Sequence, residues 1–89
     1  MTQITLEIVN VKGLHARASA KLVEVVEGFD AQAEITKDGM NASGDSIMGL
    51  LMLAAAKGSF IDVETSGEDA EALAAALTTL VADKFGEGM

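Results

Sequence analysis

The fold class is decided by residues 32–43, which read QAEITKDGMNAS. Ala33 and Ile35 alternate with polar residues, which is the period-two pattern of a strand with one buried face. Asp38-Gly39 follows as a two-residue turn, because Asp and Gly tolerate the positive backbone angles that tight hairpins need. Met40 to Ser43 then form the short returning strand. The segment therefore predicts a β-hairpin and, with it, an antiparallel sheet.

Strand and helix patterns alternate on both sides of this hairpin. Apolar and polar residues alternate over residues 4–8 and again over 61–64, which predicts two more strands. Apolar residues at helical spacing predict three helices, at about residues 16–27, 47–56 and 69–84. The order β-α-β-β-α-β-α contains no linker or internal repeat. It predicts an α+β two-layer sandwich in one domain, residues 1–89, with helices on one face of an antiparallel sheet.

Residues that start and stop helices support these boundaries. Gly28 and Gly58 lie just beyond the first and second predicted helices, where glycine often ends a helix. Ser46 is placed to cap the second helix, and its hydroxyl would accept a backbone N–H bond. Ser66 and Asp69 resemble a capping box at the start of the third helix.

Composition describes a small acidic protein. The 89 residues include 49% hydrophobic residues, enough for one core, and this core should be aliphatic because there are three Phe and no Trp or Tyr. The formal charge of -8 argues against nucleic acid and anionic membranes as partners, since basic surfaces bind both. The absence of cysteine excludes disulfides and thiolate metal sites.

The chain shows no sign of membrane insertion or secretion. Residues 1–3 lead directly into alternating sequence, without the basic and apolar regions of a signal peptide. The longest apolar stretch, residues 47–56, is far shorter than the roughly 20 residues that span a bilayer. We therefore expect a cytoplasmic protein, and a monomer unless an exposed apolar patch supports weak self-association.

The single histidine, His15, lies between the first strand and the first helix, in the sequence Gly13-Leu14-His15-Ala16-Arg17. A helix N-terminus exposes unpaired N–H groups and a partial positive charge, so it attracts phosphate. Arg17 could bind phosphate oxygens through its planar guanidinium. Residues 8–23 carry three basic residues and no acid, which also suits an anion. Neutral imidazole is a good nucleophile, so a phosphohistidine is a reasonable carrier.

His15 also has interpretations that need no chemical role. The residue could simply cap the helix or lie at the surface beside Arg17. Hydrolysis fits poorly, because residues 8–23 contain no second histidine, cysteine or carboxylate to act as a base. One histidine without clustered carboxylates also makes a metal site improbable, and the sequence implies no cofactor.

Two motifs at this separation resemble those of a known family. The first is Gly13 to Arg17, preceded by Asn10. The second is GDSIMGLL at residues 44–51, with Gly58 after it. Together with the order of elements, they are similar to HPr, the histidine-containing phosphocarrier of the bacterial phosphoenolpyruvate-dependent phosphotransferase system. The similarity covers nearly the whole chain. One departure is Ala18, where many members have proline; alanine favours the helix but leaves its entry less rigid.

The resemblance implies a fold, a reaction and partners. The family fold is an open-faced β-sandwich, a four-stranded antiparallel sheet covered by three helices. His15 would accept a phosphoryl group on Nδ1 from phosphorylated enzyme I and donate it to IIA-type domains, for sugar uptake or, in a nitrogen-related branch, for regulation. Arg17 would contact the phosphate. The protein would then be a carrier more than a free-standing enzyme, with magnesium and phosphoenolpyruvate belonging to enzyme I.

Ser46 and the helix after it have two interpretations each. Ser46 could be only a helix cap, or, as in part of the family, a regulatory serine modified by a dedicated kinase and phosphatase. The helix at 47–53 is apolar on every side, so it is either fully buried or presents a docking patch. The residues expected around His15 in such a patch are Ala16, Ala20, Ile47, Met48, Leu51 and Met52.

Two alternative functions come from other classes. An acyl carrier protein is also small and acidic, and Asp45-Ser46-Ile47 imitates its Asp-Ser-Leu motif, with Ser46 bearing the prosthetic group. Such carriers are helical bundles, however, and the hairpin at residues 32–43 does not fit one. The other alternative is a regulatory binding domain of the same fold, in the nitrogen-related branch of the family called NPr. Residues 52–55 slightly resemble that branch.

Overall fold

The structure is a computed structural model that describes residues 1–87. Its elements follow the predicted order, with a short additional turn at the end. They are β1 (Thr2–Glu7), α1 (Ala16–Glu27), β2 (Gln32–Lys37), β3 (Met40–Ser43), α2 (Ile47–Met52), β4 (Phe60–Ser66), α3 (Ala70–Ala82) and η1 (Lys84–Gly86). Among residues 1–87, no helix is long and apolar enough to cross a membrane.

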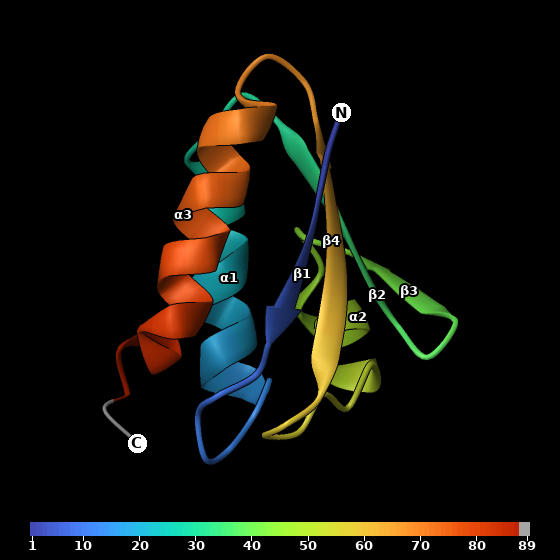
Figure 1. The fold of residues 1–89 in the computed structure, drawn as a ribbon, viewed down its shortest axis with the longest axis vertical. Helices are drawn as coiled ribbons and strands as arrows, with labels where there is room; N and C mark the ends of the chain where they lie inside the picture. The colour runs from blue at the N-terminus through green and yellow to red at the C-terminus, as the bar shows by residue number, and fades with distance from the viewer. Residues whose placement is uncertain (88–89) are drawn as a thin grey trace.

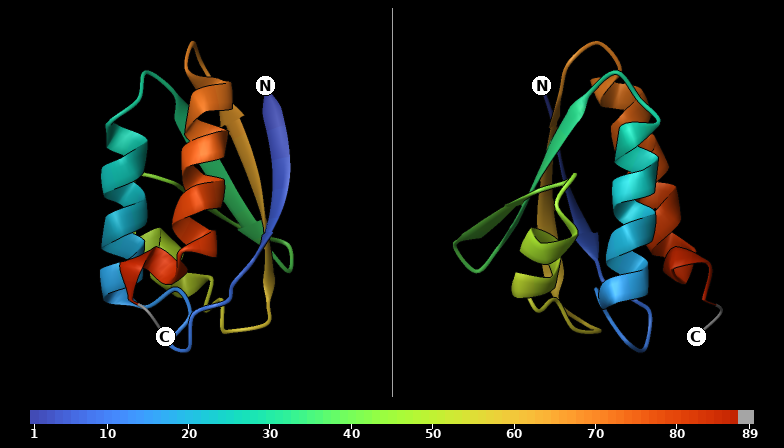
Figure 2. Two further views of the ribbon diagram at one scale, coloured as in Figure 1. Left: turned by 60° about the vertical axis from the view of Figure 1, so that its left-hand side comes forward. Right: turned by 180° about the vertical axis from the view of Figure 1, so that it is seen from behind.

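The four strands form one antiparallel sheet in the order β1-β4-β2-β3. Val63 of β4 pairs with Ile4 of β1 on one side and with Ile35 of β2 on the other. In Figure 1, α1 and α3 lie side by side against one face of this sheet, and Figure 2 shows α2 on the same side, at the end where α1 begins. The predicted open-faced, two-layer α+β architecture is therefore confirmed.

The β2–β3 hairpin turns where the sequence predicted. Asp38 and Gly39 both have positive φ, at 51° and 82°, as a two-residue hairpin turn requires. Glu34 pairs with Ser43 and Lys37 with Met40 across the two strands. The register places Ile35 and Ala42 opposite each other on the buried face.

The core lies between the sheet and the helices. Ile35, Ile61 and Val63 face it from the sheet, and Leu22 and Leu77 from α1 and α3. The predicted aliphatic core is wrong in one respect, because Phe85 is also fully buried. Leu80 of α3 is half-buried and packs against the edge of the core.

Helix α2 is shorter than predicted. It ends at Met52, and not at Ala56, because the chain leaves the helical conformation at Ala54, where φ is 50°. Leu50 is the only fully buried residue within the helix, while Leu53 and Ala55 beyond it point into the core. Residues 47–53 are apolar on every side of the helix, so the sequence pattern does not indicate where α2 ends.

The ends of α3 also differ from expectation. Ser66 belongs to β4, and the N-cap is Asp69, whose carboxylate accepts a hydrogen bond from the backbone N–H of Asp30 at 2.9 Å and not from its own helix. The capping box was thus an incorrect prediction. At the other end, α3 stops at Ala82 and η1 follows, at the end of the molecule where α1 begins (Figure 1).

Candidate functional site

The loop before α1 is tied to the segment after α2 by backbone hydrogen bonds. Ile8 donates to Ser59 and accepts from Gly58, both at 2.8 Å, and the N–H of Leu14 donates to the carbonyl of Ala55 at 2.8 Å. Gly13 has a φ of 66°, a conformation that glycine adopts without strain. These contacts hold the residue that follows Leu14 at the start of α1.

His15 is that residue, and it is the N-cap of α1. Its ring nitrogen Nδ1 accepts a hydrogen bond from the backbone N–H of Arg17 at 3.3 Å. Its backbone carbonyl accepts from Ser19 at 2.8 Å, the first turn of the helix. The imidazole thus caps the helix, as one interpretation held, yet 27% of its side chain stays exposed and available to a partner.

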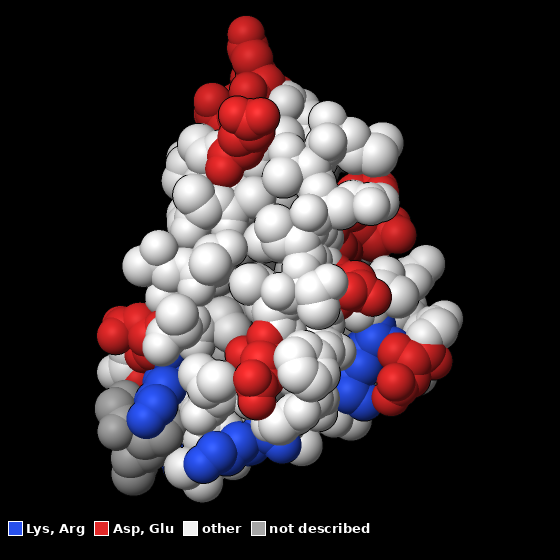
Figure 3. All heavy atoms as spheres, viewed as in Figure 1, with Lys and Arg blue, Asp and Glu red and all other residues white. Residues whose placement is uncertain are grey.

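Basic residues lie near the start of α1, as the sequence predicted. The first turn of α1 contains no acidic residue. A pocket of about 290 Å³ lies beside it, lined by Val11, Lys12, Arg17, Lys21, Gly86 and Glu87. Three of the six lysines and arginines of the chain line this one pocket. In Figure 3 the basic side chains of this view lie in its lower half, while the upper tip is acidic.

Glu87 was missed by the sequence argument. Residues 8–23 contain no carboxylate, but η1 brings Glu87 to His15 from the end of the chain. Glu87 Oε2 contacts His15 Nε2, and Glu87 Oε1 accepts from the amide of Asn10 at 2.9 Å. The hydrogen bond from Asn10 is the largest cause that lowers the pKa of Glu87; His15 and Lys12 add to it, and burial opposes it.

Ser46 is the N-cap of α2, as predicted. Its Oγ accepts a hydrogen bond from the backbone N–H of Gly49 at 3.1 Å, and the side chain is half-buried. The neighbouring carboxylate of Asp45 accepts from Ser43 at 2.6 Å.

The residues of the predicted docking patch lie on α1 and α2, which pack against each other. Met48 and Met52 are 70% and 67% exposed, and Ile47 is 40% exposed. The other predicted members are exposed at Ala16 and half-buried at Ala20 and Leu51. The helix is therefore not fully buried. Val11, which was not among the predicted residues, is also exposed and lines the pocket beside Arg17.

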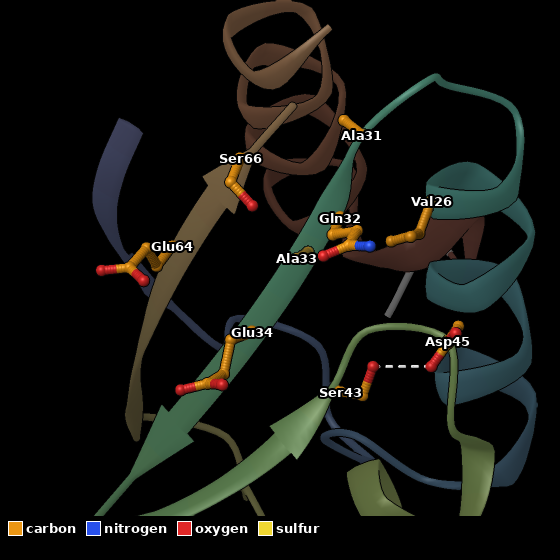
Figure 4. A pocket seen from close by; sticks show the side chains of 9 residues that line it. All are labelled: Val26, Ala31, Gln32, Ala33, Glu34, Ser43, Asp45, Glu64 and Ser66. Atoms are coloured by element: carbon orange, nitrogen blue, oxygen red, sulfur yellow. Dashed lines mark hydrogen bonds between the residues drawn. The ribbon is translucent and has the colours of Figure 1, made fainter. Parts of the chain in front are cut away.

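A second pocket, of about 330 Å³, lies along β2 and offers different chemistry (Figure 4). Its lining includes the carboxylates of Glu34, Asp45 and Glu64 and no basic residue. Within residues 1–87, no group of three or more His, Asp or Glu is arranged to hold a metal ion. This pocket shares no lining residue with the one beside His15.

Comparison with known proteins places this geometry in context. The family described as "PTS HPr component phosphorylation site" matches residues 2–83. The phosphocarrier protein HPr of Neisseria meningitidis is 47% identical over 88 residues, 99% of each chain. The phosphocarrier protein NPr of Escherichia coli is 43% identical over 84 residues, 93% of each chain. A crystal structure of HPr from Thermoanaerobacter tengcongensis superposes with a TM-score of 0.94 at 36% identity, covering both chains fully.

Proposed function

Because the chain belongs to the HPr family of phosphocarrier proteins of the phosphotransferase system, we propose that His15 carries its phosphoryl group. The observation that carries the proposal is the position of His15 as N-cap of α1, with Nδ1 directed at the backbone N–H of Arg17. A donor group that reaches Nδ1 is placed to reach phosphate oxygens as well. The ring is also partly exposed, so a partner protein can approach it.

The chemistry is a transfer of one phosphoryl group between nitrogen or oxygen donors and His15. The Nδ1 lone pair forms a bond to phosphorus while the bond from phosphorus to the donor breaks, and that electron pair stays with the donor. The helix N-terminus and the basic residues at the pocket, Lys12 and Arg17, stabilise the negative charge on the transferring group. Arg17 is the residue we assign to contact the phosphate. Transfer to the next partner reverses these steps.

The HPr family interacts with enzyme I and IIA-type proteins. We propose that this chain takes its phosphoryl group from phosphorylated enzyme I and gives it to a IIA-type domain. The exposed apolar side chains of Ile47, Met48 and Met52 support a docking surface for both, since methionine adapts to more than one partner.

Intact-mass measurement tests the proposal directly. Incubation with enzyme I, magnesium and phosphoenolpyruvate should add one acid-labile phosphate to the wild type and none to His15→Ala. Sugar-type and nitrogen-type IIA domains should then be offered to the phosphorylated protein, because relatives named HPr and NPr match at similar identity. A folded wild type that stays unphosphorylated with several enzyme I sources would contradict the assignment.

We also propose Ser46 as a regulatory site, modified by a serine kinase and restored by a phosphatase. A phosphate there would place about two negative charges next to the exposed Ile47 and Met48. It should therefore weaken docking of enzyme I.

Two substitutions separate this charge from the helix cap. Ser46→Asp and Ser46→Asn both preserve an N-cap acceptor, but only aspartate adds charge. Phosphorylation of His15 should slow in the aspartate variant and stay near wild type in the asparagine variant. Equal rates in the two variants would count against regulation through charge.

A further inference from the structure

The two ring nitrogens of His15 have different partners. Nδ1 accepts from the N–H of Arg17 at 3.3 Å, whereas Nε2 contacts a carboxylate oxygen of Glu87. A ring nitrogen that accepts a hydrogen bond carries no proton, and one that meets a carboxylate donates its proton to that bond. The neutral ring therefore carries its hydrogen on Nε2 and its lone pair on Nδ1, where it accepts the N–H of Arg17.

The carboxylate of Glu87 is itself held in place. While Oε2 faces His15, Oε1 accepts from Asn10 Nδ2 at 2.9 Å, and the same amide donates to the carbonyl of Gly13 at 2.8 Å. Asn10 is fully buried, and the Glu87 side chain is only 9% exposed. Among the described residues Asn10 Oδ1 has no hydrogen-bond partner. The buried amide therefore makes its hydrogen bonds through Nδ2, which donates to both Gly13 and Glu87.

The backbone before Glu87 is bent into an unusual conformation. Lys84, Phe85 and Gly86 all have positive φ, at 55°, 54° and 76°. This left-handed conformation costs roughly 1–2 kcal/mol for each residue other than glycine. Two contacts offset the cost: the ring of Phe85 is fully buried, and its carbonyl accepts from Lys21 Nζ at 2.7 Å. Strain of this kind is typical of segments that position a functional group.

We propose that Glu87 is a positioning residue for phosphoryl transfer, whose carboxylate keeps the His15 proton on Nε2 and so presents Nδ1 as the nucleophile. The inference rests on the proposed role of His15 as phosphoryl acceptor. It concerns a residue beyond the range matched by the family, which ends at residue 83.

The same contact also acts on the product. When Nδ1 bonds to phosphorus and the donor bond breaks, the proton remains on Nε2 and the ring becomes a cation. The carboxylate of Glu87 then faces that positive charge and stabilises it. Transfer to the next acceptor returns the electron pair to Nδ1, again without moving the Nε2 proton.

The first test reads the tautomer in the unphosphorylated protein. Long-range proton–nitrogen NMR of the His15 ring, followed to the neutral plateau of a pH titration, should show an unprotonated Nδ1 and a protonated Nε2 in the wild type. Glu87→Gln should shift both nitrogens toward a mixture, because an amide can donate as well as accept. Glu71→Gln, on the exposed side of α3, is the matched control and should leave the ring unchanged.

The second test measures the initial rate of phosphorylation by enzyme I. Loss of the oriented carboxylate should slow Glu87→Gln about tenfold, by analogy with the roughly 10–100-fold effect of removing the hydrogen-bonding partner of a metal-ligating histidine. An unchanged or faster rate, or a slower rate with unshifted ring nitrogens, would overturn the proposal. If the wild type itself takes up no phosphate, the proposed function fails, while the NMR comparison still decides whether Glu87 sets the tautomer.

Discussion

Gly13 lies against the backbone of Ala55, so that a Cβ atom on Gly13 would stand 2.4 Å from the carbonyl oxygen of Ala55. That oxygen is the acceptor for the N–H of Leu14 at 2.8 Å, the residue just before His15. The close approach therefore links the segment after α2 to the loop that carries the histidine. A side chain at position 13 would separate the two.

The first prediction concerns this contact. Gly13→Ala should lower the free energy of unfolding by more than the roughly 1–2 kcal/mol expected from a positive φ alone, because it also collides with a backbone oxygen. Gly39→Ala is the control, since Gly39 has a φ of 82° but nothing within 4 Å of its Cβ position. Urea unfolding of both variants measures the difference. Equal losses in the free energy of unfolding would show that the backbone at Ala55 moves aside at little cost.

The second prediction concerns the aromatic ring under η1. Phe85→Ala should destabilise the protein by about 3–5 kcal/mol, because it removes a fully buried ring from the core. Phe60→Ala removes a ring that is 60% exposed and should cost much less. Thermal unfolding of the two variants provides the comparison. Comparable losses would place the ring of Phe85 outside the core in solution.

The third prediction concerns acid. The Asn10 hydrogen bond, and then His15 and Lys12, lower the pKa of Glu87 below the ordinary value of 4.5. A carboxylate with a lowered folded-state pKa adds stability that is fully present above its unfolded-state value and is lost as the pH falls through the folded-state value.

Unfolding of the wild type and of Glu87→Gln at a series of pH values measures this effect. The stability advantage of the wild type should shrink as the pH drops below 4.5 and the Glu87 carboxylate takes up a proton. An advantage that does not change with pH would argue against an ionised carboxylate in this contact.

The fourth prediction concerns docking. Met48→Asp should slow phosphorylation by enzyme I roughly tenfold, equivalent to about 1.4 kcal/mol, because a charge replaces an exposed apolar side chain on α2. Met40→Asp changes an exposed methionine at the start of β3, outside the predicted docking patch, and should leave the rate unchanged. Both variants should keep the wild-type circular dichroism spectrum. Equal slowing by both would point to net charge and not to a patch on α2.

Much of the fold could be predicted because its signals are local. Period-two alternation and the Asp38-Gly39 turn located the hairpin, and helical spacing located α1 and α3. The end of α2 could not be predicted in this way, since the chain turns at Ala54, a residue that favours helices. The residues on either side of it, Leu53 and Ala55, are buried in the core, and such tertiary contacts leave no local signal in the sequence.

Half of the site could be predicted for the same reason. His15 and Arg17 lie within one motif at a helix start, so their chemistry was visible in the sequence. Glu87 was not, because it reaches His15 across 72 positions of sequence and only through the left-handed turn of η1. Two consecutive non-glycine residues with positive φ leave no recognisable sequence pattern, and Phe85 alone did not indicate where its ring would pack.

The order of strands in the sheet bears on how the protein is made. Within residues 1–87, β1 pairs with β4 alone, so residues 2–7 have no partner strand until residues 60–66 have left the ribosome. At about 5–20 residues per second, the nascent chain spends several seconds with this edge strand unpaired. In a crowded polysome, where neighbouring ribosomes carry identical nascent chains, that interval sets the time available for β1 to pair with the wrong copy.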